Sequence, residues 1–118
     1  MPRFEIYSEK YLVGWSELEL GDAPMAIAFG KFTPAPGYSK IRTSVVAAGG
    51  IAQAELHLSV RTPDGDIIEC LDVIIADYSA DLGSEGLEVT VLGIVTPSYE
   101  QLFPHHVAAY ERQFPSGS

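Results

Sequence analysis

Residues 52–76 read AQAELHLSVRTPDGDIIECLDVIIA, and this stretch decides the fold class. In its first half apolar and polar residues alternate, which is the period of a strand with one buried face and one wet face. Its second half, IIECLDVII, is apolar on both faces and is typical of a strand inside a sheet that is covered on each side. The turn sequence TPDGD separates the halves. The stretch therefore predicts two paired antiparallel strands in the middle of the chain.

The register of this hairpin decides whether a catalytic pair can form. If Asp64 and Gly65 make a two-residue turn, His57 lies opposite Asp72, and the carboxylate would orient the imidazole for acid–base chemistry. If Pro63, Asp64 and Gly65 instead form a type I turn followed by a bulge, which a proline at the second turn position favours, His57 lies opposite Leu71 and the pair is lost. The sequence leaves both registers open. Because such cross-strand neighbours commonly serve structure alone, we assign no catalytic residue and retain His57 and Asp72 as the candidates.

Similar patterns extend outward from this hairpin. Period-two or β-branched segments predict strands at residues 3–8, 11–20, 25–32 and 87–95. Residues 38–48 carry β-branched side chains but also apolar positions at helical spacing, and we expect a helix that ends at Gly49 and Gly50. Within the second strand, Tyr11, Val13 and Trp15 should share one face, and Gly14 leaves a gap for a bulky neighbour.

The C-terminal portion has the signals of a broken helix. Thr96 can cap a helix with Pro97 at its first position, and Pro104 would interrupt it. Val107, Tyr110 and Phe114 then form a stripe that can pack onto the sheet. We therefore expect a single α+β domain over residues 1–118, with a mainly antiparallel, twisted sheet of about six strands, one internal helix and a broken C-terminal helix.

The charge of the chain restricts its partners. Sixteen Asp and Glu against seven Lys and Arg give 118 residues a formal net charge of -9. This field repels phosphate backbones and anionic lipid surfaces, so we expect neither nucleic acid nor membrane as a partner. A basic protein would be attracted, for example to a wet face that bears the acidic residues Glu55, Asp72, Asp77, Asp81 and Glu85.

The sequence gives no sign of a metal or cofactor site. Cys70 is the single cysteine, so it has neither a disulfide partner nor a second thiol for a metal, and we expect an inert thiol. Adjacent His105 and His106 diverge on a helix and cannot act as a ligand pair. The chain has no apolar stretch long enough for a membrane span and no secretory signal at its start, which favours a cytoplasmic location.

Aromatic residues gather in the first three predicted strands and suggest a binding surface. These residues could fill the core, or they could line a ligand pocket or a partner surface together with Glu55 outside those strands; they are Tyr7, Tyr11, Trp15, Phe29 and Phe32. Only two short helical elements are available to cover two sheet faces. A symmetric homodimer could supply the missing cover.

One segment carries a resemblance. The pattern GWSxLxxGDxPMAIAFG over residues 14–30 resembles a segment of small bacterial proteins that have no assigned function. The resemblance implies a bacterial, cytosolic origin. It covers the turn and strand residues of the first third of the chain, and it transfers no active-site role.

The sequence favours binding over catalysis. We expect a non-catalytic, acidic protein-interaction or regulatory module. The alternative is a small-molecule-binding protein or an undescribed enzyme, with an aromatic-lined pocket near Trp15 and Phe29 and with His57 as its proton carrier.

Overall fold

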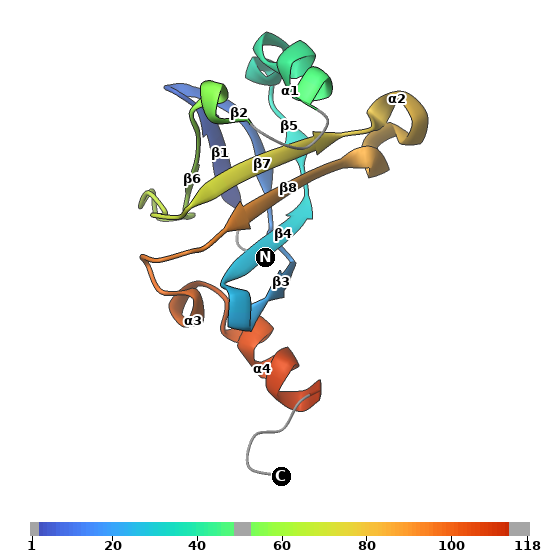
Figure 1. The fold of residues 1–118 in the computed structure, drawn as a ribbon. Helices are drawn as coiled ribbons and strands as arrows, with labels where there is room; N and C mark the ends of the chain where they lie inside the picture. The colour runs from blue at the N-terminus through green and yellow to red at the C-terminus, as the bar shows by residue number, and fades with distance from the viewer. Residues whose placement is uncertain (1–2, 49–52, 114–118) are drawn as a thin grey trace.

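The fold was analysed in a computed structural model, which describes residues 3–48 and 53–113. Within these residues eight strands form two antiparallel four-stranded sheets (Figure 1). Sheet A has the strand order β5 (Thr33–Pro34), β2 (Tyr11–Ser16), β1 (Phe4–Ser8), β6 (Leu58–Arg61). Sheet B has the order β3 (Leu20–Asp22), β4 (Ile27–Lys31), β8 (Leu87–Leu92), β7 (Asp72–Asp77). The α+β class with antiparallel sheets is confirmed.

The two sheets are joined along one side by a bent pair of chain segments. Residues 11–22 form β2 and then β3, and residues 27–34 run back beside them as β4 and then β5. The first segment crosses between the sheets at Leu18, which has a φ of 46° and a fully buried side chain. The second crosses at Phe32, also buried. Bending thus turns the expected strands into elements of two sheets.

On the other side the sheets meet without a ladder. β6 pairs with β1, and β7 pairs with β8. Buried Gln53 lies at the free edge of β7, where its side chain accepts from the Ile75 amide at 2.8 Å and donates to the Ile75 carbonyl at 2.6 Å. One amide side chain therefore satisfies both backbone groups of Ile75 at the edge of β7.

The central turn has the bulged geometry. The amide of Gly65 donates to the Thr62 carbonyl at 2.9 Å, that of Thr62 donates to the Asp66 carbonyl at 2.8 Å, and Gly65 has a φ of 94°. These are the bonds of a type I turn that closes with a bulge. The pairing continues only through the bridge between Arg61 and Ile67, so the expected long hairpin is wrong beyond that point.

The expected strand from residue 52 is also shorter than predicted. The 3₁₀ helix η3 (Ala54–Leu56) occupies its first half, and His57 has a φ of 48°. Alternation alone does not distinguish a strand from a single short turn followed by a strand. The apolar segment after the turn also differs from the prediction. Ile67 and Leu71, which precede β7, are exposed, because residues 67–71 are joined to their neighbours by isolated bridges and do not lie inside a sheet.

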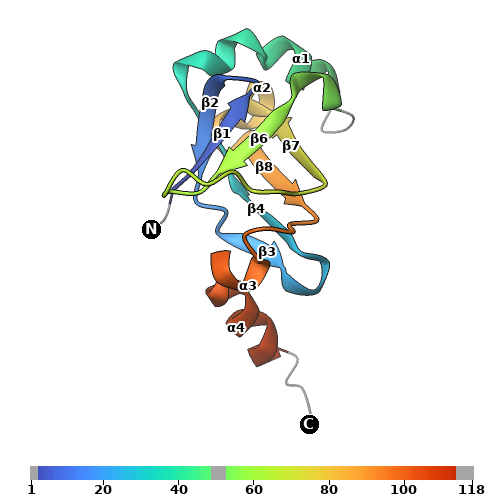
Figure 2. The same ribbon diagram turned by 90° about the vertical axis from the view of Figure 1, so that its left-hand side faces the viewer.

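Helices close the ends of the sheet pair (Figure 2). The 3₁₀ helix η2 (Pro36–Lys40) and α1 (Arg42–Ala48) confirm the internal helix, while its expected glycine end lies outside the described residues. α2 (Ser79–Leu82) and the 3₁₀ helix η4 (Gly83–Gly86) fill the loop before β8, and the 3₁₀ helix η1 (Ala23–Met25) precedes β4. α3 (Tyr99–Leu102) and α4 (Pro104–Gln113) confirm the broken C-terminal helix.

The details of that C-terminal helix differ from the prediction. Ser98, not Thr96, is the cap, and it forms a capping box with Gln101. Tyr99, Phe103 and His106 are the buried residues of this region. The expected stripe of Val107, Tyr110 and Phe114 does not pack as a whole onto the sheet, because Tyr110 is 40% exposed. Phe114 lies outside the described residues.

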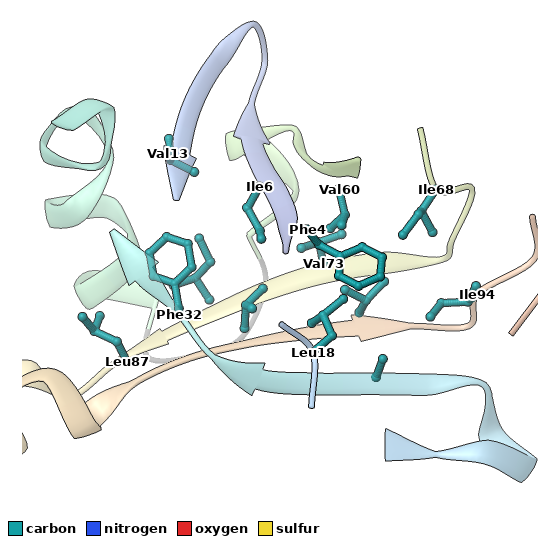
Figure 3. Packing of buried hydrophobic residues seen from close by; sticks show 14 of the residues in the cluster. Phe4, Ile6, Val13, Leu18, Phe32, Val60, Ile68, Val73, Leu87 and Ile94 are labelled. Carbon is teal, nitrogen blue, oxygen red and sulfur yellow. The ribbon is translucent and has the colours of Figure 1, made fainter. Parts of the chain in front are cut away.

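The core lies between the inner faces of the two sheets (Figure 3). Phe4 and Ile6 of β1 face Val73 and Ile75 of β7 across this layer. Gly14 provides the expected gap, since a Cβ there would lie 2.4 Å from the ring of Phe32. The inner residues of each strand alternate with an outer set, which leaves two outer sheet faces to consider as sites.

Candidate functional site

The candidate catalytic pair is not assembled. The bulged turn excludes the register that sets His57 opposite Asp72. Asp72 instead lies opposite Leu92 of β8, and its carboxylate accepts from the Val73 amide at 2.8 Å. His57 precedes β6 as an exposed residue, and its carbonyl accepts from the Glu9 amide at 3.1 Å.

Cys70 shows no sign of an activated thiol. It is half-buried, and burial, together with the neighbouring Asp72, raises the pKa of its thiol above the ordinary value. A raised pKa reduces the fraction of nucleophilic thiolate. Across residues 3–48 and 53–113, no group of three or more His, Cys, Asp or Glu side chains is arranged to hold a metal ion.

A β-bulge in sheet A separates the aromatic residues that the sequence placed together. The register shifts between Ile6 and Tyr7, so Val13 points into the core while Trp15 points outward. Tyr11 is exposed at the end of the hairpin, where its ring lies 4.6 Å from the Lys40 ammonium. The prediction that these aromatics share one face is wrong, because a bulge changes the alternation that it interrupts.

Trp15 lies on the outer face of sheet A beneath an arginine. The Arg3 guanidinium is 4.3 Å from the centroid of the Trp15 ring, which is half-buried. Across the strands Trp15 lies opposite Glu5 on one side and Thr33 on the other. A guanidinium over an indole face is an attractive cation–π contact that also fixes the orientation of the arginine.

A second stack of the same kind lies on this face. The Arg61 guanidinium is 4.4 Å from the centroid of the Tyr7 ring, and Tyr7 lies opposite Ser59 of β6. Arg61 Nε is buried and has no hydrogen-bond partner among the described residues. Arg61 also lies opposite Glu5, which ties the two stacks into one cross-strand row. We call Glu5, Tyr7, Trp15, Arg61 and the stacking Arg3 the cation–aromatic face.

A hollow of about 320 Å³ borders the cation–aromatic face. Its walls contain two cations, two carboxylates and one hydroxyl, from Arg3, Lys31, Glu17, Glu19 and Thr33. The Glu19 carboxylate accepts from the Lys31 amide at 3.1 Å. The expected aromatic-lined pocket is therefore wrong in its chemistry, since charged groups surround the hollow beside Trp15.

Phe29 lies on a different surface, the outer face of sheet B. It is half-buried on β4, opposite Leu20 of β3 and Thr90 of β8. Because Ala28 and Gly30 on either side of it are buried, Phe29 points away from the core. Trp15 and Phe29 therefore do not line a common pocket.

The acidic residues are scattered rather than gathered on one wet face. Glu55 is exposed in η3, beside a hollow of about 340 Å³ that Gln53 and the end of α1 also line. Asp72 and Asp77 lie at opposite ends of β7. The Asp77 side chain is fully buried, so the expectation of a single acidic docking face is wrong at this residue.

Asp77 serves as the centre of a polar network that joins α1 to α2. Its carboxylate accepts from the Tyr38 hydroxyl at 2.6 Å and from the Ser79 hydroxyl at 2.5 Å, and the Arg42 Nε lies 3.5 Å away. Burial alone would raise the pKa of Asp77, but these hydrogen bonds and the guanidinium hold it below its ordinary value. Burial, and the bond to Asp77, raise the pKa of Tyr38.

A buried tyrosine–histidine pair anchors the C-terminal helix. The Tyr99 hydroxyl donates to the Ile27 carbonyl at 2.9 Å and lies 2.8 Å from His106 Nδ1. Both side chains press against Gly21, where a Cβ would lie 2.1 Å from the Tyr99 oxygen. Burial lowers the pKa of His106, with a smaller lowering by His105, and raises the pKa of Tyr99 to about 12.

The sequence indicated part of the cation–aromatic face. It pointed to Tyr7 and Trp15 as aromatic residues of the first strands, but it did not indicate that Arg3 and Arg61 stack on them. Alternation in β1 marks Tyr7 as an outward residue, since its neighbours Ile6 and Ser8 are buried. The pairing with Arg61 has no local sequence signal, because β1 and β6 are about fifty residues apart in the chain.

Comparisons with known proteins add no relative. No family model matches the chain, and neither the curated proteins nor the solved structures contain a match. Of the helices in the described part of the chain, none combines the length and the apolar character that crossing a bilayer requires.

Proposed function

We propose that this chain is a non-catalytic protein-interaction module that binds a partner protein through the cation–aromatic face of sheet A. The observation that carries the proposal is the pair of ordered stacks, Arg3 over Trp15 and Arg61 over Tyr7, on a sheet face turned away from the core. Trp, Tyr and Arg are the residue types that contribute most to protein–protein binding energy. Stacking fixes these long side chains in advance and so reduces the entropy cost of binding.

The charge of the chain favours a basic partner. The formal net charge of -9 attracts a basic protein from a distance. Within the face, Arg3 and Arg61 are balanced by Glu5 and the neighbouring Glu17, so the contact area does not repel such a partner. Association should accordingly slow as ionic strength rises, since salt screens the long-range attraction.

Matched variants test this proposal. Tagged protein carrying Trp15→Ala or Tyr7→Ala would be purified from cells that naturally produce it, and co-purifying proteins would be quantified by mass spectrometry. The control is Tyr78→Ala, which removes an aromatic ring that is 53% exposed, away from sheet A. The proposal predicts one basic protein that is retained by Tyr78→Ala and lost from both face variants. Equal recovery from all three variants would contradict it.

The second candidate function is small-molecule binding at the hollow beside Trp15. Its support is the convergence of the Arg3 and Lys31 cations with the Glu17 and Glu19 carboxylates in about 320 Å³, which fits a small ligand that carries both charges. Native mass spectrometry of the purified protein tests it. A co-purifying metabolite that is lost in Lys31→Ala, with the protein partner retained, would favour this candidate over the first.

A further inference from the structure

The outer face of sheet B has an apolar middle that crosses its four strands, with Lys31 and Glu88 at one end and the exposed Asp22 and Asp72 at the other. A single cross-strand row contains Leu20, Phe29, Thr90 and Ile74, each opposite the next in the register. One step further along the strands, Ile27 of β4 and Leu92 of β8 continue the apolar surface. We call these six residues the apolar face.

The chain itself leaves the apolar face open. Leu20 is 53% exposed, and Phe29, Ile74 and Leu92 are half-buried without being part of the core cluster. Figure 1 shows no helix in front of β7, β8 and β4. Among the described elements, α4 packs at β3 and η1 below the sheet, and α1 lies at its upper end. A sheet face of this composition is ordinarily covered by another layer.

The charges at one end of the apolar face show which layer fits. Lys31 of β4 lies opposite Glu88 of β8, immediately beyond the apolar row. The present partner of Lys31 is Glu85 at 3.5 Å, and both side chains are at least half exposed, so this ion pair is weak and can be exchanged. Lys31 and Glu88 therefore lie at the same height on either side of the line between β4 and β8.

A two-fold axis along that line sets opposite charges against each other at the Lys31 end of the face. If the axis runs parallel to the strands between β4 and β8, β4 of one copy covers β8 of the other, at the spacing of packed sheets, about 10 Å. Lys31 then faces Glu88 of the second copy, Phe29 faces Thr90, and Leu20 faces Ile74. All three contacts occur twice, as an isologous interface requires. At the other end of the face Asp22 lies over Asp72 of the second copy, and this like-charge contact adds to the repulsion between the two copies.

We infer that a second copy of this chain covers the apolar face of sheet B and forms a two-fold dimer with Lys31 and Glu88 paired across the interface. The dimer uses a different face from the proposed partner-binding site and stands without it. Its salt dependence has the opposite sign, because two copies of charge -9 repel each other and added salt screens that repulsion.

Sedimentation equilibrium of the full chain tests the dimer. The wild type should form dimers, and these should tighten between about 0.05 M and about 0.5 M NaCl. Thr90→Arg introduces bulk at the centre of the face and should weaken the dimer by about tenfold or more. Trp15→Ala on sheet A is the matched control and should leave it unchanged. A wild type that remains monomeric at all concentrations would overturn the inference, as would a dimer that tolerates Thr90→Arg.

Reversing the charges of Lys31 and Glu88 tests the two-fold geometry, and because both residues are exposed it should leave the stability of the fold largely unchanged. Lys31→Glu and Glu88→Lys change exposed residues, and each alone should weaken the dimer. The double variant should restore it, because each reversed charge again meets its opposite on the second copy. Circular dichroism confirms that every variant is folded before its mass is compared. Single variants that have no effect, or a double variant that is no better than the singles, would overturn the proposed arrangement.

Discussion

The outer faces of sheets A and B differ in composition, although their inner faces contribute to one core. On sheet A the outward positions carry Trp15 and Tyr7 beneath arginines, whereas on sheet B they carry aliphatic residues around Phe29. Inner positions are constrained by packing, but outer positions are free to differ. The difference motivates the two proposals made above, a basic protein partner for sheet A and a second copy of the chain for sheet B.

The largest loss of stability should come from a substitution on the inner face of sheet A. Gly14 faces inward, and a Cβ there would lie 2.4 Å from the Phe32 ring and 2.5 Å from the Thr33 carbonyl. Gly14→Ala should therefore lower the free energy of unfolding by about 3 kcal/mol or more. The control is Gly65→Ala, whose Cβ meets nothing within 4 Å and which costs only backbone strain, about 1 kcal/mol. Equal urea midpoints for the two variants would contradict the packing.

The second largest loss of stability should come from Gln53, which bonds the free edge of β7 where the two sheets meet. Gln53→Ala leaves the Ile75 amide and carbonyl without their side-chain partners in a buried edge. We expect a loss of about 2–4 kcal/mol in the free energy of unfolding, measured by urea denaturation. Gln101→Ala removes a comparable amide from an exposed capping box and should cost less. A smaller loss for Gln53→Ala than for Gln101→Ala would show that the edge of β7 does not depend on Gln53.

The C-terminal anchor should make stability depend on pH. Burial lowers the pKa of His106 in the folded state, so the unfolded chain binds the proton first as the pH falls through about 6.5. This contribution to stability is therefore fully present above that pH and is lost below it, by about 1.4 kcal/mol for each unit of pKa difference. Urea midpoints at about pH 7.5 and about pH 5 measure the loss.

His106→Gln should flatten this pH dependence. His57→Gln, at an exposed position, should leave it as in the wild type. A wild-type profile that His106→Gln does not change would exclude the buried imidazole as its source.

The smallest effect on stability should come from the cation–aromatic face. Trp15→Ala removes an outward, half-buried ring and its stack with Arg3, and should cost about 1 kcal/mol or less in the free energy of unfolding. Its effect on partner binding should be far larger, since interface tryptophans commonly contribute 2 kcal/mol or more. A Trp15→Ala protein that loses stability as severely as Gly14→Ala would place Trp15 in the core instead.

Local patterns predicted much of this fold. Strands β1, β2 and β8, the internal helix and the break at Pro104 were all predicted, because each depends on periodicity or on proline within a few residues. The division into two sheets was not predicted. It depends on the crossings at Leu18 and Phe32, and a hydrophobic pattern gives no indication that a strand changes sheets.

The candidate faces depended on register, which the sequence left open. The sequence grouped Tyr11 with Trp15 on one face, but a bulge opposite Tyr7 places the two residues on different sides of sheet A. Phe29 lies on the other sheet. The bulged turn at Gly65 likewise separates His57 from Asp72. Each outcome follows from one extra residue in a bulge, and an extra residue moves the side chains beyond it to the opposite face of the sheet.

Photocrosslinking tests most directly that the two faces meet different molecules. A photoreactive amino acid would replace Ser59, which lies opposite Tyr7 on sheet A, or Thr90, at the centre of the apolar face on sheet B. Irradiation of producing cells should give an adduct with another protein from the Ser59 position and an adduct of twice the chain mass from the Thr90 position. The same adduct from both positions, or a homodimer from Ser59 alone, would contradict the account.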